Sequence, residues 1–198
     1  MNALTTELGA LTIGRDGSML GATAGYQQVL GGMDGVYRDR LAYRRQLTDR
    51  GPDDLVYSVT EHRAGNDAGA LIVGTSTLRP GSYGEEFAMT RGHLHAIADR
   101  AELYHCLAGH GVMLLESIAG DHRAVELVEG QAVHVPGHWV HRSVNVASVP
   151  FVTLFCYSAD AGQNYELISR AGGMATLVVK DVAGWKTVPN PDHTGYQL

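Results

Sequence analysis

The chain has few cysteines and a shortage of basic side chains. Cys106 and Cys156 are its only two cysteines, too few for a disulfide framework, so we interpret both as reduced thiols of a cytoplasmic protein. Its 15 lysines and arginines are outnumbered by 21 acidic residues, which gives a net charge of −6 at pH 7. Because an acidic chain repels phosphate backbones, a nucleic-acid partner is not expected.

Long apolar stretches are also missing. No run approaches the ~18 consecutive apolar residues that a membrane-spanning helix needs. Residues 1–20 lack the basic segment followed by an apolar segment that marks a secretory signal. We find no low-complexity segment and no repeat of fixed period. From these features we expect a cytoplasmic protein without a membrane partner.

What the chain does contain is typical of a turn-rich β protein. It has 25 glycines, and its 44% hydrophobic and 18% charged residues are the composition of a globular chain. From residue 55 onward, short segments rich in β-branched and aromatic residues are separated by Gly, Pro, Asp or Asn, which favours an all-β barrel or sandwich. The expected strand segments are 55–63, 70–80, 85–95, 102–109, 111–117, 123–129, 131–136, 141–146, 150–158 and 174–180.

We expect one domain over residues 1–198. In this interpretation residues 1–50 form strands and a helix packed on the barrel, residues 51–180 form the barrel, and residues 181–198 form a C-terminal tail. The spacing of apolar residues over 36–49 predicts a short amphipathic helix, whose arginines we interpret as a solvated face rather than a binding patch. A second helix is expected around 161–171.

The pair His93 and His95 is the first feature with chemistry in it. Residues two apart on a strand point to the same face, so the two imidazoles form a ready pair of metal ligands inside a barrel. Alone, such a pair is more often coincidence than a ligand. Glu102 begins a strand that we expect to run beside the histidine strand. An inward carboxylate there needs a partner such as a metal, whereas an outward one is an ordinary solvated acid.

A second spaced pattern strengthens the metal interpretation. From Gly130 the chain has a turn glycine, a strand, a turn at Pro136, and a strand that carries His141 and Asn145. These residues resemble the second motif of the cupin superfamily, G-x5-P-x-G-x2-H-x3-N. His138 stands where that family has its second glycine. The resemblance implies an all-β cupin (jelly-roll) barrel.

The first cupin motif resembles the segment from His93 to Gly109, with a longer gap between His95 and Glu102 than the general pattern has. Together, the blocks T-x-G-H-x-H, D-R-x-E-x-Y, W-x-x-H-R-x-x-N and Y-x-A-D-A-G resemble the cupin-type glucose-6-phosphate isomerases over about residues 90–179. That resemblance implies a homodimer and one divalent metal ion. It favours Fe(II), although three imidazoles and a carboxylate also suit Mn(II), Ni(II) or Zn(II). The implied ligands are His93, His95, Glu102 and His141.

The same resemblance implies a set of substrate-binding residues. Thr90 and Gly92 correspond to phosphate contacts, and a hydroxyl and a backbone N–H are suitable phosphate donors in an acidic protein. The other implied pocket residues are Tyr104, Tyr157, Gln163 and Tyr165. Gln163 replaces a histidine of the archaeal pattern, and a glutamine forms hydrogen bonds but carries no proton at neutral pH. Each tyrosine fits equally well as a core aromatic with a bonded hydroxyl.

The implied reaction interconverts glucose 6-phosphate and fructose 6-phosphate. Our hypothesis is that the metal binds O1 and O2 of the open-chain sugar as a Lewis acid, while Glu102 moves a proton between C1 and C2. Tyr157 is the second candidate catalytic residue. A direct hydride shift between the two carbons is the alternative route. Another sugar phosphate, such as mannose 6-phosphate, stays open as the substrate.

Two other functions fit the same ligand set. An Fe(II) cupin dioxygenase is the alternative enzyme, and it would consume oxygen. A non-catalytic cupin that binds sugar phosphates is the alternative binding protein. The phosphate donors beside His93 favour the isomerase over both.

Overall fold

A computed structural model describes residues 9–197 of the chain. The expectations for residues 1–8 and for Leu198 lie outside this described part. Its elements in chain order are β1 (Thr12–Ile13), β2 (Met19–Leu20), β3 (Ala24–Val29), the 3-10 helix η1 (Leu30–Met33), α1 (Arg40–Arg50), β4 (Leu55–Arg63), β5 (Leu71–Leu78), β6 (Ser82–Tyr83), β7 (Glu86–Phe87), β8 (Glu102–Ala108), β9 (His110–Ser117), β10 (His122–Val128), β11 (Ala132–Val135), β12 (Trp139–Asn145), β13 (Phe151–Ser158), α2 (Glu166–Arg170), β14 (Thr176–Asp181) and β15 (Gly184–Pro189).

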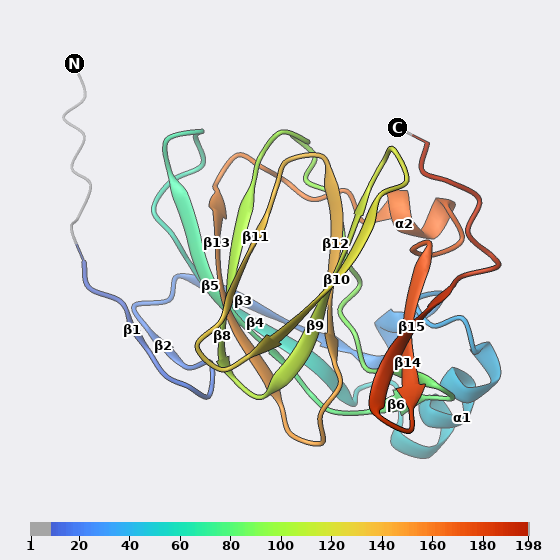
Figure 1. Cartoon of the computed structure of the whole chain (residues 1–198). Helices are drawn as coiled ribbons and strands as arrows, with labels where there is room; N and C mark the ends of the chain where they lie inside the picture. Colours follow the sequence, from blue (N-terminus) through green and yellow to red (C-terminus); the bar gives the residue numbers. More distant parts are fainter. Residues whose placement is uncertain (1–8, 198) are drawn as a thin grey trace.

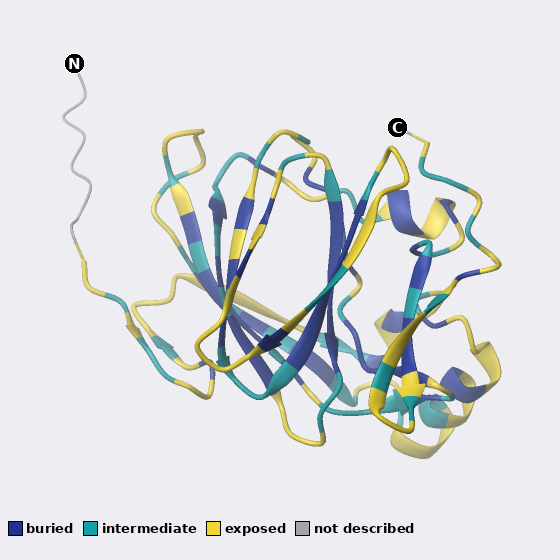
Figure 2. Ribbon diagram, viewed as in Figure 1, coloured by how far each residue is buried: buried dark blue, intermediate teal, exposed yellow. Residues whose placement is uncertain are grey.

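Two antiparallel sheets curve around a common interior (Figure 1). The larger sheet has six strands in the order β11-β8-β13-β5-β4-β3, and the smaller has three in the order β10-β9-β12. The expectation of an all-β barrel is therefore confirmed. Figure 2 shows that β9, β12 and β13 are largely buried, whereas β10 and most of the connecting turns are more exposed.

Alternation along the strands decides which side chains face the interior. On β8, Glu102 and Tyr104 are buried while Leu103 between them is 42% exposed. The same period of two on β4 buries Tyr57, Val59 and Glu61. Because successive strand residues point to opposite faces, each of these polar side chains is directed to the barrel interior by its position alone.

An outer layer covers the smaller sheet. It contains a four-stranded sheet of order β15-β14-β7-β6 together with α2 (Figure 1). Glu116 on β9 ties this layer to the barrel, because its buried carboxylate accepts the N–H groups of Ala175 and Thr176, each at 2.8 Å. Sequence reasoning missed β15, which pairs with β14 along its whole length in the stretch expected to be a tail.

The segment expected as a strand over 85–95 forms one only at Glu86–Phe87. Beyond it the chain makes isolated bridges, including His93 with His141 and Leu94 with Asn164. Gly92 interrupts the strand because it adopts a φ of +72° and lies so close to β12 that a Cβ would come 2.9 Å from the carbonyl oxygen of His141. The expected histidine strand is therefore wrong in form, although His93 remains extended against β12.

The expected position of the Glu102 strand is also wrong. β8 pairs with β11 and β13, not with the segment that carries His93 and His95. Instead that segment lies against β12 of the smaller sheet. Glu102 therefore reaches the histidines from the larger sheet, across the interior of the barrel.

The expected helix over 36–49 begins four residues later, at Arg40. Asp39 caps it by accepting a hydrogen bond from the N–H of Ala42 at 2.8 Å. Arg44 and Arg45 are exposed, as the interpretation of a solvated face expects. The second helix is short, Glu166–Arg170. Within the described residues, no helix has the length and apolar character to cross a membrane.

The turn before β12 forms although His138 replaces the second glycine of the cupin motif. His138 adopts a φ of +68° and is the one non-glycine residue with positive φ in the described range. Its N–H donates to the carbonyl of Ala98 at 2.5 Å. Gly137 supplies the close approach, since a Cβ there would lie 2.5 Å from the carbonyl oxygen of Asp99. The two positions together still make the turn that leads into His141.

Asn145, at the end of β12, offers a test of this packing. Its side chain is fully buried, donates to the carbonyls of Leu78 (3.0 Å) and Val149 (2.9 Å), and accepts the N–H of Ala147 (2.9 Å). Replacing Asn145 with Ala leaves these backbone groups unpaired, so we expect a loss of about 2–3 kcal/mol in the free energy of unfolding.

Urea denaturation measures this loss, with Gln27→Ala on the exposed face of β3 as the control. The control should change stability by less than about 0.5 kcal/mol. Equal stability of the two variants would contradict the role assigned to Asn145.

Candidate metal centre

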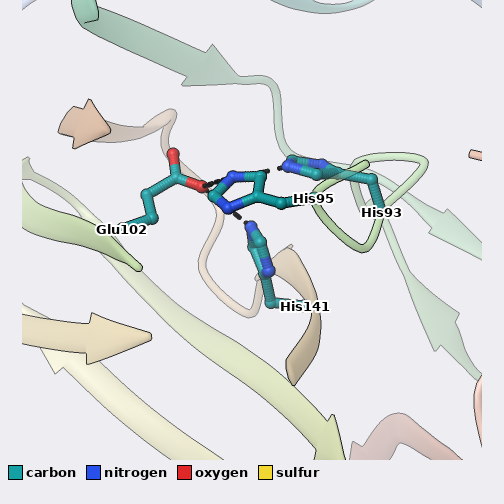
Figure 3. A group of neighbouring side chains, drawn as sticks. All are labelled: His93, His95, Glu102 and His141. Carbon is teal, nitrogen blue, oxygen red and sulfur yellow. Dashed lines mark hydrogen bonds and ion pairs between the residues drawn. The ribbon is translucent and has the colours of Figure 1, made fainter. Parts of the chain in front are cut away.

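Four side chains from both sheets converge in the barrel interior: His93, His95, Glu102 and His141 (Figure 3). One ligand atom from each lies within 4.8 Å of the others, and all four residues are buried. Glu102 comes from β8, His141 from β12, and the two other histidines from the segment beside β12. The structure thus brings together every residue of the ligand set expected from the sequence; metal binding by that set stays a prediction.

Hydrogen bonds on the outer side of two imidazoles fix their tautomers. His95 Nδ1 lies 2.8 Å from the carbonyl oxygen of Arg100, and His141 Nδ1 lies 3.1 Å from that of Trp139. A carbonyl only accepts, so each Nδ1 carries a proton and each ring turns its Nε2 inward. This is the arrangement found around metal-bound histidines.

The inner Nε2 atoms face one carboxylate oxygen. Oε2 of Glu102 lies 2.9 Å from Nε2 of His141, 3.2 Å from Nε2 of His95 and 3.9 Å from Nε2 of His93. The Nε2 atoms of His93 and His95 are buried without a hydrogen-bond partner. Buried polar groups seldom stay unpaired, and a cation between them would satisfy all four. The residues therefore fit a divalent metal ion.

The charges in the cluster suit metal binding as well. Burial alone would raise the pKa of Glu102, but hydrogen bonds with His141 and His95 outweigh burial and hold this pKa at about 2. Burial, reinforced by His141, moves the pKa of His93 well below its usual range. At neutral pH the carboxylate is ionised and His93 is neutral, which are the states in which these groups bind metals.

A cavity opens beside the cluster. His93, Glu102 and His141 line it, while His95 does not. All six residues expected to bind substrate also line this cavity: Thr90, Gly92, Tyr104, Tyr157, Gln163 and Tyr165.

The two expected phosphate contacts lie on the same stretch of backbone. Thr90 pairs with Ser143 of β12, and its Oγ1 accepts the N–H of Ser143 at 3.1 Å, which leaves its own O–H to donate. The Gly92 N–H makes no hydrogen bond within residues 9–197, and its positive φ orients it differently from the strand that precedes it. The cavity wall at these positions therefore offers a hydroxyl and an amide as donors.

Sequence reasoning missed the part of the cavity wall that β3 and β4 supply, before the start of the recognised blocks. These residues are Tyr26, Tyr57, Val59, Glu61 and Arg63. The segment 55–63 predicted a strand, and the four residues on it occur at every second position from Tyr57 to Arg63. Period-two alternation was the available signal, but it did not show which face would meet the histidines.

Comparison with known proteins agrees with the site. A family model described as Glucose-6-phosphate isomerase (GPI) matches residues 27–193. The chain belongs to the glucose-6-phosphate isomerase family.

Curated relatives of the isomerase family cover most of the chain. The glucose-6-phosphate isomerase of Sinorhizobium medicae is 42% identical over 177 residues, 89% of this chain and 82% of that protein. The enzyme of the same name from Pyrococcus furiosus is 38% identical over 162 residues, 82% and 84% of the two chains. Among solved structures, oxalate oxidase in complex with glycolate matches with a TM-score of 0.48 and 14% identity, covering 60% of this chain and 61% of that one.

An ion pair between Arg100 and Asp160 links two of the sequence blocks that carry the isomerase resemblance. Arg100 donates from Nε and Nη2 to the two carboxylate oxygens of Asp160, at 3.0 and 2.8 Å. Hydrogen bonds from Arg100 and Ser158 hold the pKa of Asp160 below its usual range. The carbonyl of Arg100 accepts the Nδ1 proton of His95, so the ion pair holds the residue whose backbone contacts an imidazole of the cluster.

Asp160→Asn tests that link. Loss of the ion pair should loosen the Arg100 carbonyl and lower the affinity for a divalent metal by about 10–100-fold. Competition with a coloured chelator measures the affinity. The control is Asp53→Asn, an exposed acid far along the chain from the site. Equal metal affinities for both variants would show that the pair does not orient His95.

Proposed function

We propose that this chain is a metal-dependent isomerase that interconverts glucose 6-phosphate and fructose 6-phosphate. The observation that carries the proposal is the shared cavity. It joins a buried cluster of three imidazoles and a carboxylate to the phosphate donors Thr90 and Gly92. The names of the curated relatives support the choice of substrates.

The metal would be held by His93, His95, Glu102 and His141. A divalent ion there would supply Lewis-acid stabilisation of negative charge on neighbouring sugar oxygens. Fe(II) is the ion we propose, on the sequence resemblance, with Mn(II), Ni(II) and Zn(II) as alternatives suited to the same donors.

Glu102 is the proposed base that transfers a proton between C1 and C2 of the sugar. Its Oε2 makes the contacts with all three imidazoles, so Oε1 is the oxygen available to take and return a proton. Its low pKa keeps it ionised at neutral pH and therefore able to accept that proton.

Tyr157 is the proposed donor beside this base. It pairs with Glu102 across β13 and β8, and its ring lies 5.4 Å from that of His95. Burial and the charge of Glu102 raise the pKa of Tyr157, so its hydroxyl keeps its proton and donates to sugar oxygens. Thr90 and Gly92 would fix the phosphate end, and Gln163 with Tyr165 would close the cavity beside them.

We also propose that the protein is a single-domain homodimer and that it is located in the cytoplasm. A homodimer formed along a sheet edge is supported by β3, the outer strand of the six-stranded sheet, which is largely exposed. A single domain over residues 1–198 is supported by Leu30 and Met33, which belong to the same buried apolar cluster as the barrel strands. A cytoplasmic location follows from the proposed substrate, because a phosphorylated sugar does not cross a membrane unaided.

A coupled assay on fructose 6-phosphate tests the function directly. We expect turnover by the metal-loaded protein, loss of turnover after chelation, and recovery when Fe(II) is returned. His141→Ala should lower kcat by about 100-fold or more, because it removes one metal ligand.

The matched control for this variant is His134→Ala, an exposed histidine on β11 outside the cavity. It should keep wild-type turnover. Undiminished turnover by the chelated protein or by His141→Ala would contradict the proposal. Oxygen uptake in place of isomerisation would favour a dioxygenase.

Deuterated water distinguishes the two chemical routes. If Glu102 carries the proton, glucose 6-phosphate formed from fructose 6-phosphate should contain deuterium at C2, because the carboxyl proton exchanges with solvent between steps. Mass spectrometry or proton NMR of the product measures the label. Product without deuterium at C2 would indicate a hydride shift and remove the proposed role of Glu102.

A further inference from the structure

A second carboxylate faces the cavity from outside the metal cluster. Glu61 lies on β4, is 6% exposed, and lines the cavity together with Tyr157 and Tyr165. Its Oε1 accepts a hydrogen bond from Nε of Arg63 at 2.7 Å. The Arg63 side chain is 42% exposed while that of Glu61 is 8% exposed, so the guanidinium lies on the solvent side of the pair.

The proposed reaction needs a proton transfer that Glu102 does not provide. Hexose phosphates exist in water mainly as closed rings, and isomerisation between C1 and C2 requires the open chain. To open glucose 6-phosphate, the proton leaves the O1 hydroxyl, the C1–O5 bond breaks as the C1=O1 bond forms, and O5 takes up a proton. No electrons are gained or lost, so one group that accepts and returns a proton is sufficient.

Few groups in the described cavity wall can do this at neutral pH. His93, His141 and Glu102 belong to the metal cluster. The arginines that line the cavity stay protonated. Gln163, which replaces a histidine of the family pattern, has no proton to exchange.

The tyrosines of the cavity are also unsuitable. Burial, as the largest cause, raises the pKa of every tyrosine that lines it, so none ionises near neutral pH. Glu61 is the carboxylate that remains outside the cluster.

Glu61 lines the cavity together with Tyr157 and Tyr165, whose hydroxyls also interact with Glu102. Glu61 and Glu102 both raise the pKa of the Tyr157 hydroxyl, and both raise that of Tyr165, so the two carboxylates act on the same pair of hydroxyls. The Nε of Arg63 bonds to Oε1 and leaves Oε2 outside this pair. Arg63 donates a charge-assisted hydrogen bond to one carboxylate oxygen of Glu61, and the other oxygen is left to accept the proton of O1.

The geometry points to Glu61 as the ring-opening residue. It takes the O1 proton and delivers a proton to O5, while Glu102 acts afterwards between C1 and C2. This assignment rests on the proposed isomerase function. It makes Glu61 and Arg63 a functional pair in the cavity wall.

The test compares Glu61→Gln with wild type in three measurements. Magnetisation exchange in NMR follows the interconversion of the α and β anomers of glucose 6-phosphate, which requires ring opening alone. The coupled assay follows isomerisation. Inhibition by an acyclic sugar-acid phosphate, 5-phosphoarabinonate, reports binding without ring opening. In Glu61→Gln we expect the rates of catalysed anomer exchange and of isomerisation to fall by about 100-fold or more. The inhibition constant of 5-phosphoarabinonate should stay at the wild-type value.

Two further variants control the interpretation. Glu85→Gln removes an exposed carboxylate between β6 and β7, outside the cavity, and should behave as wild type. Glu61→Asp keeps a carboxylate on a shorter side chain and should retain more anomer exchange than Glu61→Gln. Glu61→Asp also decides the question if Glu61→Gln fails to fold.

Wild-type rates of anomer exchange in Glu61→Gln would overturn the assignment. Weaker inhibition in parallel with the slower rates would overturn it too, since Glu61 would then only shape the cavity. If the wild-type protein isomerises and Glu61→Gln is equally active, the ring-opening role of Glu61 is contradicted but the proposed function is not. A metal-loaded wild type that neither isomerises nor exchanges anomers contradicts the proposed function, and the role of Glu61 with it.

Discussion

The structure depends on how one buried carboxylate is compensated. Glu102 is almost fully buried, and an ionised carboxylate in an apolar interior is stable only if it is paired. Three imidazoles surround it, and the outer hydrogen bonds of His95 and His141 turn the Nε2 atoms of these rings toward it. The cluster is therefore a set of buried ligand atoms that a cation would complete. Both sheets contribute to it, so binding of a metal there would also stabilise the closed barrel.

Much of the fold and of the cluster could be predicted from the sequence. Short β-branched segments separated by glycine and proline give nearly every strand from β4 onward, because alternation and turn residues act locally. By resemblance to a known family, the spacing of His93, His95, Glu102 and His141 predicted that these four side chains belong to one site, and the structure brings them together. The strands and this convergence could be predicted because each depends on residues close in sequence, or on a motif that preserves a set of distant ones. Metal binding by the four side chains stays a prediction.

The remainder depends on tertiary packing. Gly92 looked like a residue within a strand, yet it has a positive φ and lies close against β12, next to the bridge that joins His93 to the smaller sheet. The partner strands of β8 could not be inferred from local pattern, so Glu102 was expected on the wrong side of the barrel. Glu61 lay unnoticed in an ordinary strand pattern, because only the folded sheet shows which face meets the cavity.

The central claim is that four convergent side chains bind one divalent ion. Elemental analysis of purified protein, set against protein concentration, tests it most directly. The account predicts close to one equivalent of a divalent transition metal per chain in wild type and a large loss in His141→Ala. An active wild-type protein without bound metal, or a His141→Ala protein that keeps its full equivalent, would contradict it.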